Sequence, residues 1–134
     1  MATRALVLFA HGARSASWAA PFERLRDLVQ GRAPDVAVSL AFLELMEPRL
    51  PAQVAALVGQ GIRDITVVPV FLGQGGHVLR DLPLLLDELR AAHPGLRLQA
   101  VGAVGEDPSV LAAMTDYCVG ALSGDPGAVH TDAG

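Results

Sequence analysis

Apolar and polar positions alternate along this chain in a pattern that predicts four strand–helix units. Four short runs are apolar, several of them rich in β-branched residues, and they predict strands at residues 5–10, 36–43, 64–72 and 96–101. Each run precedes a longer stretch whose apolar residues recur at a spacing of three or four, as on one face of a helix. These stretches are residues 17–32, 50–60, 108–122 and a helix that begins at 78 or 83 and ends at 92.

Glycine, proline and aspartate mark several ends of these predicted elements. Gly59 closes the second helix, and Asp107 followed by Pro108 is a typical helix start, with a capping carboxylate and a proline in the first turn. Pro69 interrupts the third apolar run, because proline offers no N–H to a neighbouring strand. We expect it at a bulge or at an exposed strand end.

Strict alternation of strands and helices predicts an α/β fold, a single three-layer α/β/α domain with helices on both faces of a parallel sheet. Right-handed crossovers favour the strand order 2-1-3-4, which corresponds to half of a flavodoxin-like domain. In this order strands one and three are neighbours, and ligands of such sheets bind beyond the carboxyl ends of the strands. We expect the domain to span residues 1–122, and the small, polar stretch 123–134 to be a disordered tail.

Composition narrows the function classes. The chain has 134 residues, of which 51% are hydrophobic, enough for one core, and its net charge of −4 gives no reason to expect a nucleic-acid partner. No run approaches the roughly 18 apolar residues of a membrane span. The opening residues fit a first strand better than a signal peptide, so we expect a cytoplasmic protein that does not associate with membranes.

The reactive side chains are few. Cys118 is the only cysteine, so an intrachain disulfide or a cysteine-rich metal cluster is excluded. All 10 basic residues are arginine, which excludes a Schiff-base lysine and the lysine of a phosphate-binding loop.

Two histidines follow neighbouring strands of the predicted sheet. His11 comes directly after the first strand, and His77 follows Gly75 and Gly76 after the third. Neighbouring strands lie about 4.8 Å apart, so both imidazoles can reach one metal ion or one substrate atom. An ordinary exposed loop histidine is the alternative at each position. His93 and His130, at a helix end and in the tail, are expected to be structural or solvated.

Glu44, at the end of the second strand, or Glu47 just before Pro48 can supply a carboxylate to the same edge of the sheet. Two imidazoles and a carboxylate suit divalent iron, cobalt, nickel or zinc, and they can also accept protons. A solvated carboxylate at a strand end is the ordinary alternative.

Three arginines lie just past strands one, two and three, and they can pair with an acidic substrate; they are Arg14, Arg49 and Arg80. Most surface arginines have no such role. We expect Asp81 to cap a helical turn at Pro83 rather than to take part in catalysis.

These motifs together resemble the short class II chelatases of the CbiX family, the sirohydrochlorin cobaltochelatases. The matching segments are HGAR at 11–14, FLE at 42–44, EP at 47–48, VPVFL at 68–72, GGHV at 75–78 and RDLP at 80–83. The resemblance covers about residues 4–122. Ala13 departs from the pattern, because many relatives carry serine there, but the predicted ligands are retained.

The resemblance implies a chelatase fold and the insertion of a divalent metal into sirohydrochlorin, a carboxylate-rich tetrapyrrole, without ATP or another nucleotide. Co²⁺, for cobalamin, is the first expectation, with Fe²⁺ for siroheme or Ni²⁺ as alternatives. By resemblance, His11 and His77 would hold the metal and take up pyrrole protons, and Glu44 would assist them. The residues expected to contact the tetrapyrrole are Arg14, Arg49, Gly75, Gly76 and Arg80.

Longer relatives carry two such halves in one chain, whereas this chain carries one. One four-stranded unit makes only one wall of a cleft for a tetrapyrrole, so we expect a homodimer with two-fold symmetry and a pocket between the subunits.

Other functions also place a histidine after a first strand. Histidine phosphatases need an arginine directly before it, but Ala10 stands there. A histidine phosphocarrier would explain His11 but not the glycine-rich segment before His77. A metal or tetrapyrrole carrier that does not catalyse insertion is the third alternative.

Overall fold

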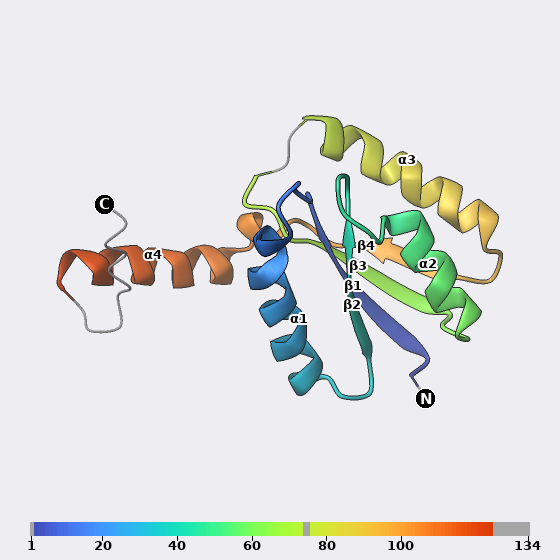
Figure 1. Cartoon of the computed structure of the whole chain (residues 1–134), viewed down its shortest axis with the longest axis horizontal. Helices are drawn as coiled ribbons and strands as arrows, with labels where there is room; N and C mark the ends of the chain where they lie inside the picture. Colours follow the sequence, from blue (N-terminus) through green and yellow to red (C-terminus); the bar gives the residue numbers. More distant parts are fainter. Residues whose placement is uncertain (1, 74–75, 125–134) are drawn as a thin grey trace.

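The computed structural model, which describes residues 2–73 and 76–124, has the four strand–helix units that the sequence predicts (Figure 1). The strands are β1 (Arg4–Ala10), β2 (Ala37–Phe42), β3 (Asp64–Pro69) and β4 (Arg97–Ala100). The helices are α1 (Ala20–Arg32), α2 (Leu50–Gly59), α3 (Gly76–Ala92) and α4 (Pro108–Leu122), with 3₁₀ turns η1 (Ala16–Ala19) and η2 (Val104–Glu106). The predicted tail lies outside the described residues from 125 onward, so its disorder stays a prediction.

The four strands form one parallel sheet with the order β2-β1-β3-β4, which confirms the predicted topology. Leu8 of β1 is aligned with Leu40 of β2 on one side and Val68 of β3 on the other. This register brings the carboxyl ends of the three strands to the same edge of the sheet, where the candidate site residues were expected.

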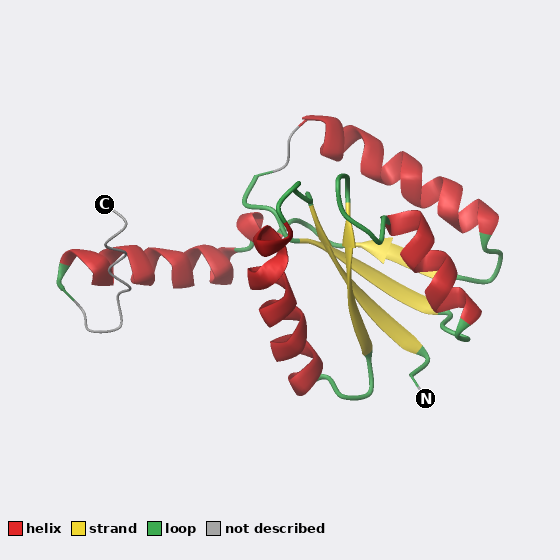
Figure 2. Ribbon diagram, in the orientation of Figure 1, coloured by secondary structure: helices red, strands yellow, loops and turns green. Residues whose placement is uncertain are grey.

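Each face of the sheet has its own apolar core, because side chains alternate between the faces along each strand. On one face, Val7 and Ile65 pack with buried residues of α2 and α3, such as Val54. On the other, Leu8 and Leu40 pack with residues of η1 and α1. Figure 2 shows α2 and α3 together on one side of the sheet and α1 on the other, as the three-layer prediction requires.

The third helix begins earlier than predicted. It starts at Gly76 rather than at 78 or 83, so Pro83 lies inside α3 and Asp81 does not cap a helix start. An internal proline costs about 3 kcal/mol because it removes a hydrogen bond. Four buried apolar residues of α3 offset that cost by continuing one stripe onto the sheet; they are Val78, Leu82, Leu86 and Leu89.

Pro69 is the last residue of β3, so of the two expected positions, a bulge or an exposed strand end, it takes the strand end. On the β4 side of β3, the Val101 N–H donates to the Val67 carbonyl at 3.0 Å, and the next bond of a parallel ladder would need an N–H from residue 69. Proline has none, so the β3–β4 ladder stops at this point. The side chain of Pro69 is buried rather than exposed, since it points into the α2–α3 side of the sheet. The strand therefore ends three residues before the predicted boundary at Leu72.

The last helix, α4, has the predicted bounds and the predicted cap. The Asp107 carboxylate accepts hydrogen bonds from the Ser109 hydroxyl and from the backbone N–H groups of Ser109 and Val110. The Ser109 hydroxyl, and after it the Val110 N–H, hold the pKa of Asp107 below its ordinary value. Unlike α1, α2 and α3, helix α4 extends away from the sheet, and its main contact among the described residues is with η2 at its start (Figure 2).

We expect the stability of α4 to fall in acid. The pKa of Asp107 is lowered by folding, so the carboxylate stabilises the helix start above the unfolded-state pKa. This contribution is lost as pH falls through the folded-state pKa. Asp107→Asn keeps a capping oxygen but should remove this pH dependence, whereas Asp107→Ala should also weaken the helix at neutral pH. Hydrogen exchange of the α4 amides against pH measures both effects, and identical profiles for wild type and Asp107→Asn would contradict the assignment.

No described helix is both long enough and apolar enough to cross a lipid bilayer.

Candidate functional site

The turn after β1 presents His11 and joins it closely to the end of β2. The Leu43 N–H donates to the Ala10 carbonyl at 2.8 Å, and the Glu44 N–H donates to the His11 carbonyl at 3.0 Å. These bonds extend the β1–β2 ladder beyond both strands. Gly12 has φ +93°, and a Cβ there would lie 1.8 Å from the Glu44 carbonyl oxygen. Only glycine fits this turn, which fixes the two segments side by side.

The imidazole of His11 stacks on Phe71, a contact that the sequence analysis did not anticipate. The ring centroids lie 4.1 Å apart with 31° between the planes. Phe71 is 3% exposed, and it is brought there because the Val70 N–H donates to the Phe9 carbonyl at 2.8 Å. One face of the imidazole is therefore held by a fixed ring, while the side chain of His11 as a whole is exposed.

A cavity of about 710 Å³ opens between the carboxyl ends of β1 and β2 and the first half of α3. Its polar lining residues are His11, Glu44, Arg49 and Asp81. The remaining lining residues are apolar: Phe9, Leu43, Val78, Leu82 and Leu85. An apolar pocket with a few converging polar groups is the usual form of a small-molecule site, and this volume is typical of one.

Three of the predicted site residues thus share one cavity, namely His11, Glu44 and Arg49. Asp81, for which we expected a capping role, also lines it. The reason is the early start of α3, which places Asp81 on the inner side of an established helix. Asp81 lies one residue before Leu82 and four before Leu85, and both leucines line the same cavity. On a helix this spacing could have placed Asp81 on their side.

The structure separates Glu44 from Glu47. Glu44 is exposed and lines the cavity, whereas Glu47 lies across the Glu47–Pro48 cis peptide bond, where its carboxylate accepts a bond from the Arg49 N–H at 3.3 Å. Glu47 lines a different hollow, on the side of α1. The geometry therefore favours Glu44 as the carboxylate of this site.

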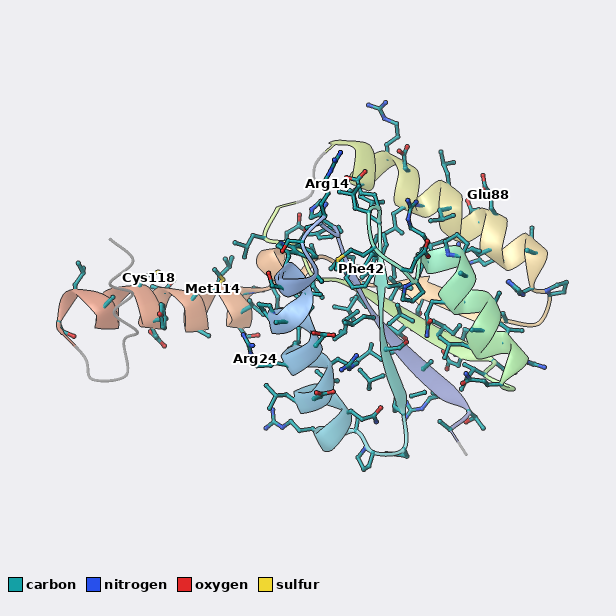
Figure 3. The ribbon with its side chains drawn as sticks, in the orientation of Figure 1. Arg14, Arg24, Phe42, Glu88, Met114 and Cys118 are labelled. Carbon is teal, nitrogen blue, oxygen red and sulfur yellow. The ribbon has the colours of Figure 1, made fainter. Side chains whose placement is uncertain are left out.

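The other predicted site residues are less well placed or lie outside the described part. Arg14 and Arg80 are exposed and do not line the cavity, although Arg14 lies at the same end of the molecule as the loops after the strands (Figure 3). Gly76 and His77 form the first residues of α3. Gly75 and the side chain of His77 lie outside the described residues, so the meeting of His11 and His77 stays a prediction.

Within the described residues, no three histidine, cysteine, aspartate or glutamate side chains are grouped to hold a metal ion. That result leaves out the imidazole of His77, the second predicted ligand. The described site therefore has one stacked imidazole and two exposed carboxylates, Glu44 and Asp81, on a cavity wall that also carries Arg49. Such a set can exchange protons and can offer one or two ligands to an incoming cation.

Comparison with known families shows that the CbiX family profile matches residues 5–118 of this chain. A sirohydrochlorin cobaltochelatase of Methanocaldococcus jannaschii is 37% identical over 89 residues, which cover 66% of this chain and 62% of that protein. A sirohydrochlorin ferrochelatase of Bacillus subtilis (strain 168) is 32% identical over 75 residues, covering 56% of this chain and 29% of that protein. The matches thus span less than two thirds of the length of these curated relatives.

Two solved structures share the fold. A CbiX protein from Marinobacter aquaeolei VT8 superposes with a TM-score of 0.79 at 32% identity, covering 90% of this chain and 98% of that one. The sirohydrochlorin chelatase SirB from Bacillus subtilis subspecies spizizenii, in complex with cobalt, has a TM-score of 0.74 at 24% identity. That match covers 87% of this chain but 50% of SirB, so one copy of this chain corresponds to half of the longer protein.

Proposed function

This chain belongs to the CbiX family, and from that premise we propose that it inserts a divalent metal ion into sirohydrochlorin. The observation that carries the proposal is the cavity that holds His11, Glu44 and Arg49 at the carboxyl ends of the strands. It lies where ligands of parallel sheets bind. The names of the relatives, which include cobaltochelatases and a ferrochelatase, support the same reaction.

The reaction requires that the two pyrrole N–H groups lose their protons while the metal ion exchanges its own ligands for the four ring nitrogens. A neutral imidazole can bind a divalent ion or accept a proton near neutral pH. His11 has the exposure and the fixed orientation for this role, since its ring stacks on Phe71 at 4.1 Å. We propose that His77, at the start of α3, supplies the second imidazole.

The carboxylate and the arginines complete the proposed site. Glu44 can accept a proton or contact the metal ion, because its backbone is bonded to that of His11 and its side chain lines the cavity. Arg49 lines the same cavity, and its guanidinium can pair with the peripheral carboxylates of a tetrapyrrole. Arg14 and Arg80, which are exposed, would act at the rim of the site, where Gly75 and Gly76 would allow a close approach.

We propose Co²⁺ as the first metal to test. Cobaltochelatases, including one that is 39% identical over 67 residues, stand above the ferrochelatase in similarity. Fe²⁺ for siroheme is the second candidate because of that ferrochelatase, and the same ligand types also suit Ni²⁺. The metal is a substrate here, and no nucleotide is proposed.

We further propose that the active form is a homodimer in the cytoplasm. One copy of this chain supplies a cavity at one set of strand ends. SirB, in contrast, contains a second half of similar length to this chain within the same polypeptide. Two copies related by a two-fold axis would supply both walls of a cleft for a planar macrocycle.

The proposal is tested by an anaerobic absorbance assay of sirohydrochlorin with Co²⁺, Fe²⁺ or Ni²⁺. We expect a metal-dependent spectral change that is faster with the protein than without it, and fastest with Co²⁺. Heat-denatured protein at the same concentration controls for metal binding by the polypeptide. Folded protein that accelerates insertion of none of the metals would overturn the proposal, and tight binding of sirohydrochlorin without turnover would favour a carrier.

A further inference from the structure

Asp81 is a carboxylate on the wall of the candidate site with no structural partner in the described part of the chain. It lines the cavity together with His11, Glu44 and Arg49, and its side chain is exposed. Neither ion pair of the described residues includes it, and no described hydrogen bond ends on its carboxylate. It is the sixth residue of α3, so it lies past the first turn, where a carboxylate stabilises a helix start. Its oxygens are therefore free to meet a ligand.

The helix holds Asp81 firmly at the cavity. Val78 and Leu82, on either side of it in the sequence, are 5% and 9% exposed and belong to the core between α3 and the sheet. Both also line the cavity, as does Leu85 one turn further along. Glu44 follows β2 instead, so the two carboxylates reach the same cavity from different walls, one from a helix and one from the strand ends.

Insertion of a divalent ion into the macrocycle releases two protons. Two pyrrole N–H bonds break, and both electron pairs stay on nitrogen, where they bind the ion. Nothing is oxidised or reduced, so the only other products are the two protons. Each N–H becomes more acidic as the ion approaches the ring, which lets a weak base such as a carboxylate accept its proton.

The two imidazoles proposed as metal ligands cannot take these protons while they hold the ion. A neutral imidazole has one nitrogen with a free lone pair, and a bound metal ion occupies that pair. His11 and His77 become proton acceptors only after the ion has moved to the ring. During insertion, the acceptors that remain on the described wall of the cavity are the carboxylates of Glu44 and Asp81.

We propose that Asp81 is a catalytic residue that accepts one of the two pyrrole protons, while Glu44 accepts the other. Each carboxylate becomes a neutral carboxyl group as the dication becomes part of a neutral metal–ring unit. The sum of these charges is zero before and after the step, so no unbalanced charge is left beneath the macrocycle, where it would be costly. A single carboxylate would leave one positive charge behind.

This role exists only if the protein inserts a metal, so it rests on the proposed function. It assigns to the helix wall of the site a task that the ligand residues do not perform. A carboxylate that merely binds the incoming ion would affect the concentration of metal needed for half-maximal rate. A proton acceptor affects the rate of the insertion step itself.

The test is the kinetics of metal insertion by the full chain carrying Asp81→Asn. Asparagine has nearly the same size and keeps an acceptor oxygen, but it does not take up a proton. We expect kcat to fall about 100-fold. The KM for the metal should stay unchanged, and so should the dissociation constant of sirohydrochlorin, measured by absorbance titration without metal. Asp81→Ser serves as the second variant if Asp81→Asn does not fold.

Glu88→Gln is the matched control, because it makes the same change of charge on the same helix. Glu88 is exposed toward the far end of α3 and does not line the cavity, so this variant should keep the wild-type rate (Figure 3). Glu44→Gln, which removes the other acceptor, should lower kcat by a factor similar to that of Asp81→Asn.

Four results would overturn the role of Asp81 while leaving the chelatase activity intact. They are a wild-type kcat in Asp81→Asn, a raised KM for the metal at unchanged kcat, weakened binding of sirohydrochlorin as the whole effect, and an equal loss of rate in Glu88→Gln. The second would show that Asp81 binds the ion, and the third that it binds the macrocycle. Wild-type protein that binds sirohydrochlorin but inserts no metal would instead contradict the proposed function, and the role of Asp81 with it.

Discussion

Replacement of His11 by alanine is expected to lower the rate of metal insertion by about 100-fold or more, within the range measured for loss of a general acid or base. His11 is the one imidazole that the described structure places in the cavity, and Phe71 holds its ring in position. Its side chain is exposed and has no side-chain hydrogen bond among the described residues, so the substitution removes the imidazole together with its stacking on Phe71.

The measurement is the initial rate of the sirohydrochlorin assay with saturating metal, together with a melting curve for each variant. His77→Ala should show a similar loss if the second imidazole meets the first. His93→Ala is the matched control, because His93 is half-buried just past the far end of α3 and does not line the cavity. Full activity in His11→Ala, with the rate lost in Glu44→Gln instead, would assign proton transfer to the carboxylate and contradict the proposed role of His11.

Much of this fold could be predicted because its signals are local. The bounds of α4 follow from Asp107 and Pro108 at its start and from the end of apolar spacing at Leu122. The strand order follows from two general rules, alternation of strands and helices and right-handed crossover. His11, Glu44 and Arg49 could be assigned to one site because each follows a strand that ends at the same edge.

The contacts that could not be predicted depend on packing between distant segments. Phe71 was expected within a longer third strand, and its stacking on His11 results from a backbone bond between Val70 and Phe9. Asp81 was expected to cap a helix, because Pro83 is a typical helix-start signal. The buried stripe of α3 instead extends the helix past that proline and turns Asp81 toward the cavity.

The position of α4 shows a further limit of sequence patterns. The spacing of its apolar residues predicts a helix, but it carries no information on where that helix lies relative to the sheet. That depends on the anchoring of Gly105 under Leu72 and on the single-residue connection at Asp107. Both are properties of the folded chain, and they direct the helix away from the sheet that the same sequence builds.

Gly12→Ala is expected to destabilise the protein by about 3 kcal/mol. It should also reduce the rate of metal insertion, because the turn at Gly12 would be displaced from the end of β2. A φ of +93° is unfavourable for alanine, which costs about 1–2 kcal/mol. The added Cβ would also lie 1.8 Å from the Glu44 carbonyl oxygen, a backbone atom, so the two segments would have to separate. That separation would break the bond between the Glu44 N–H and the His11 carbonyl and move both proposed site residues.

Urea unfolding measures the loss of stability from Gly12→Ala, and the chelatase assay below the melting range measures the loss of activity. Gly31→Ala is the matched control, since Gly31 lies within α1 with nothing inside 4 Å of the added Cβ. It should stabilise the protein by about 0.5–1 kcal/mol, as alanine does in place of glycine in helices, with unchanged activity. Equal stability of the two variants would contradict the close contact between the turn at Gly12 and the end of β2. A Gly12→Ala protein that is destabilised but fully active would show instead that the fixed spacing of His11 and Glu44 is not required for the reaction.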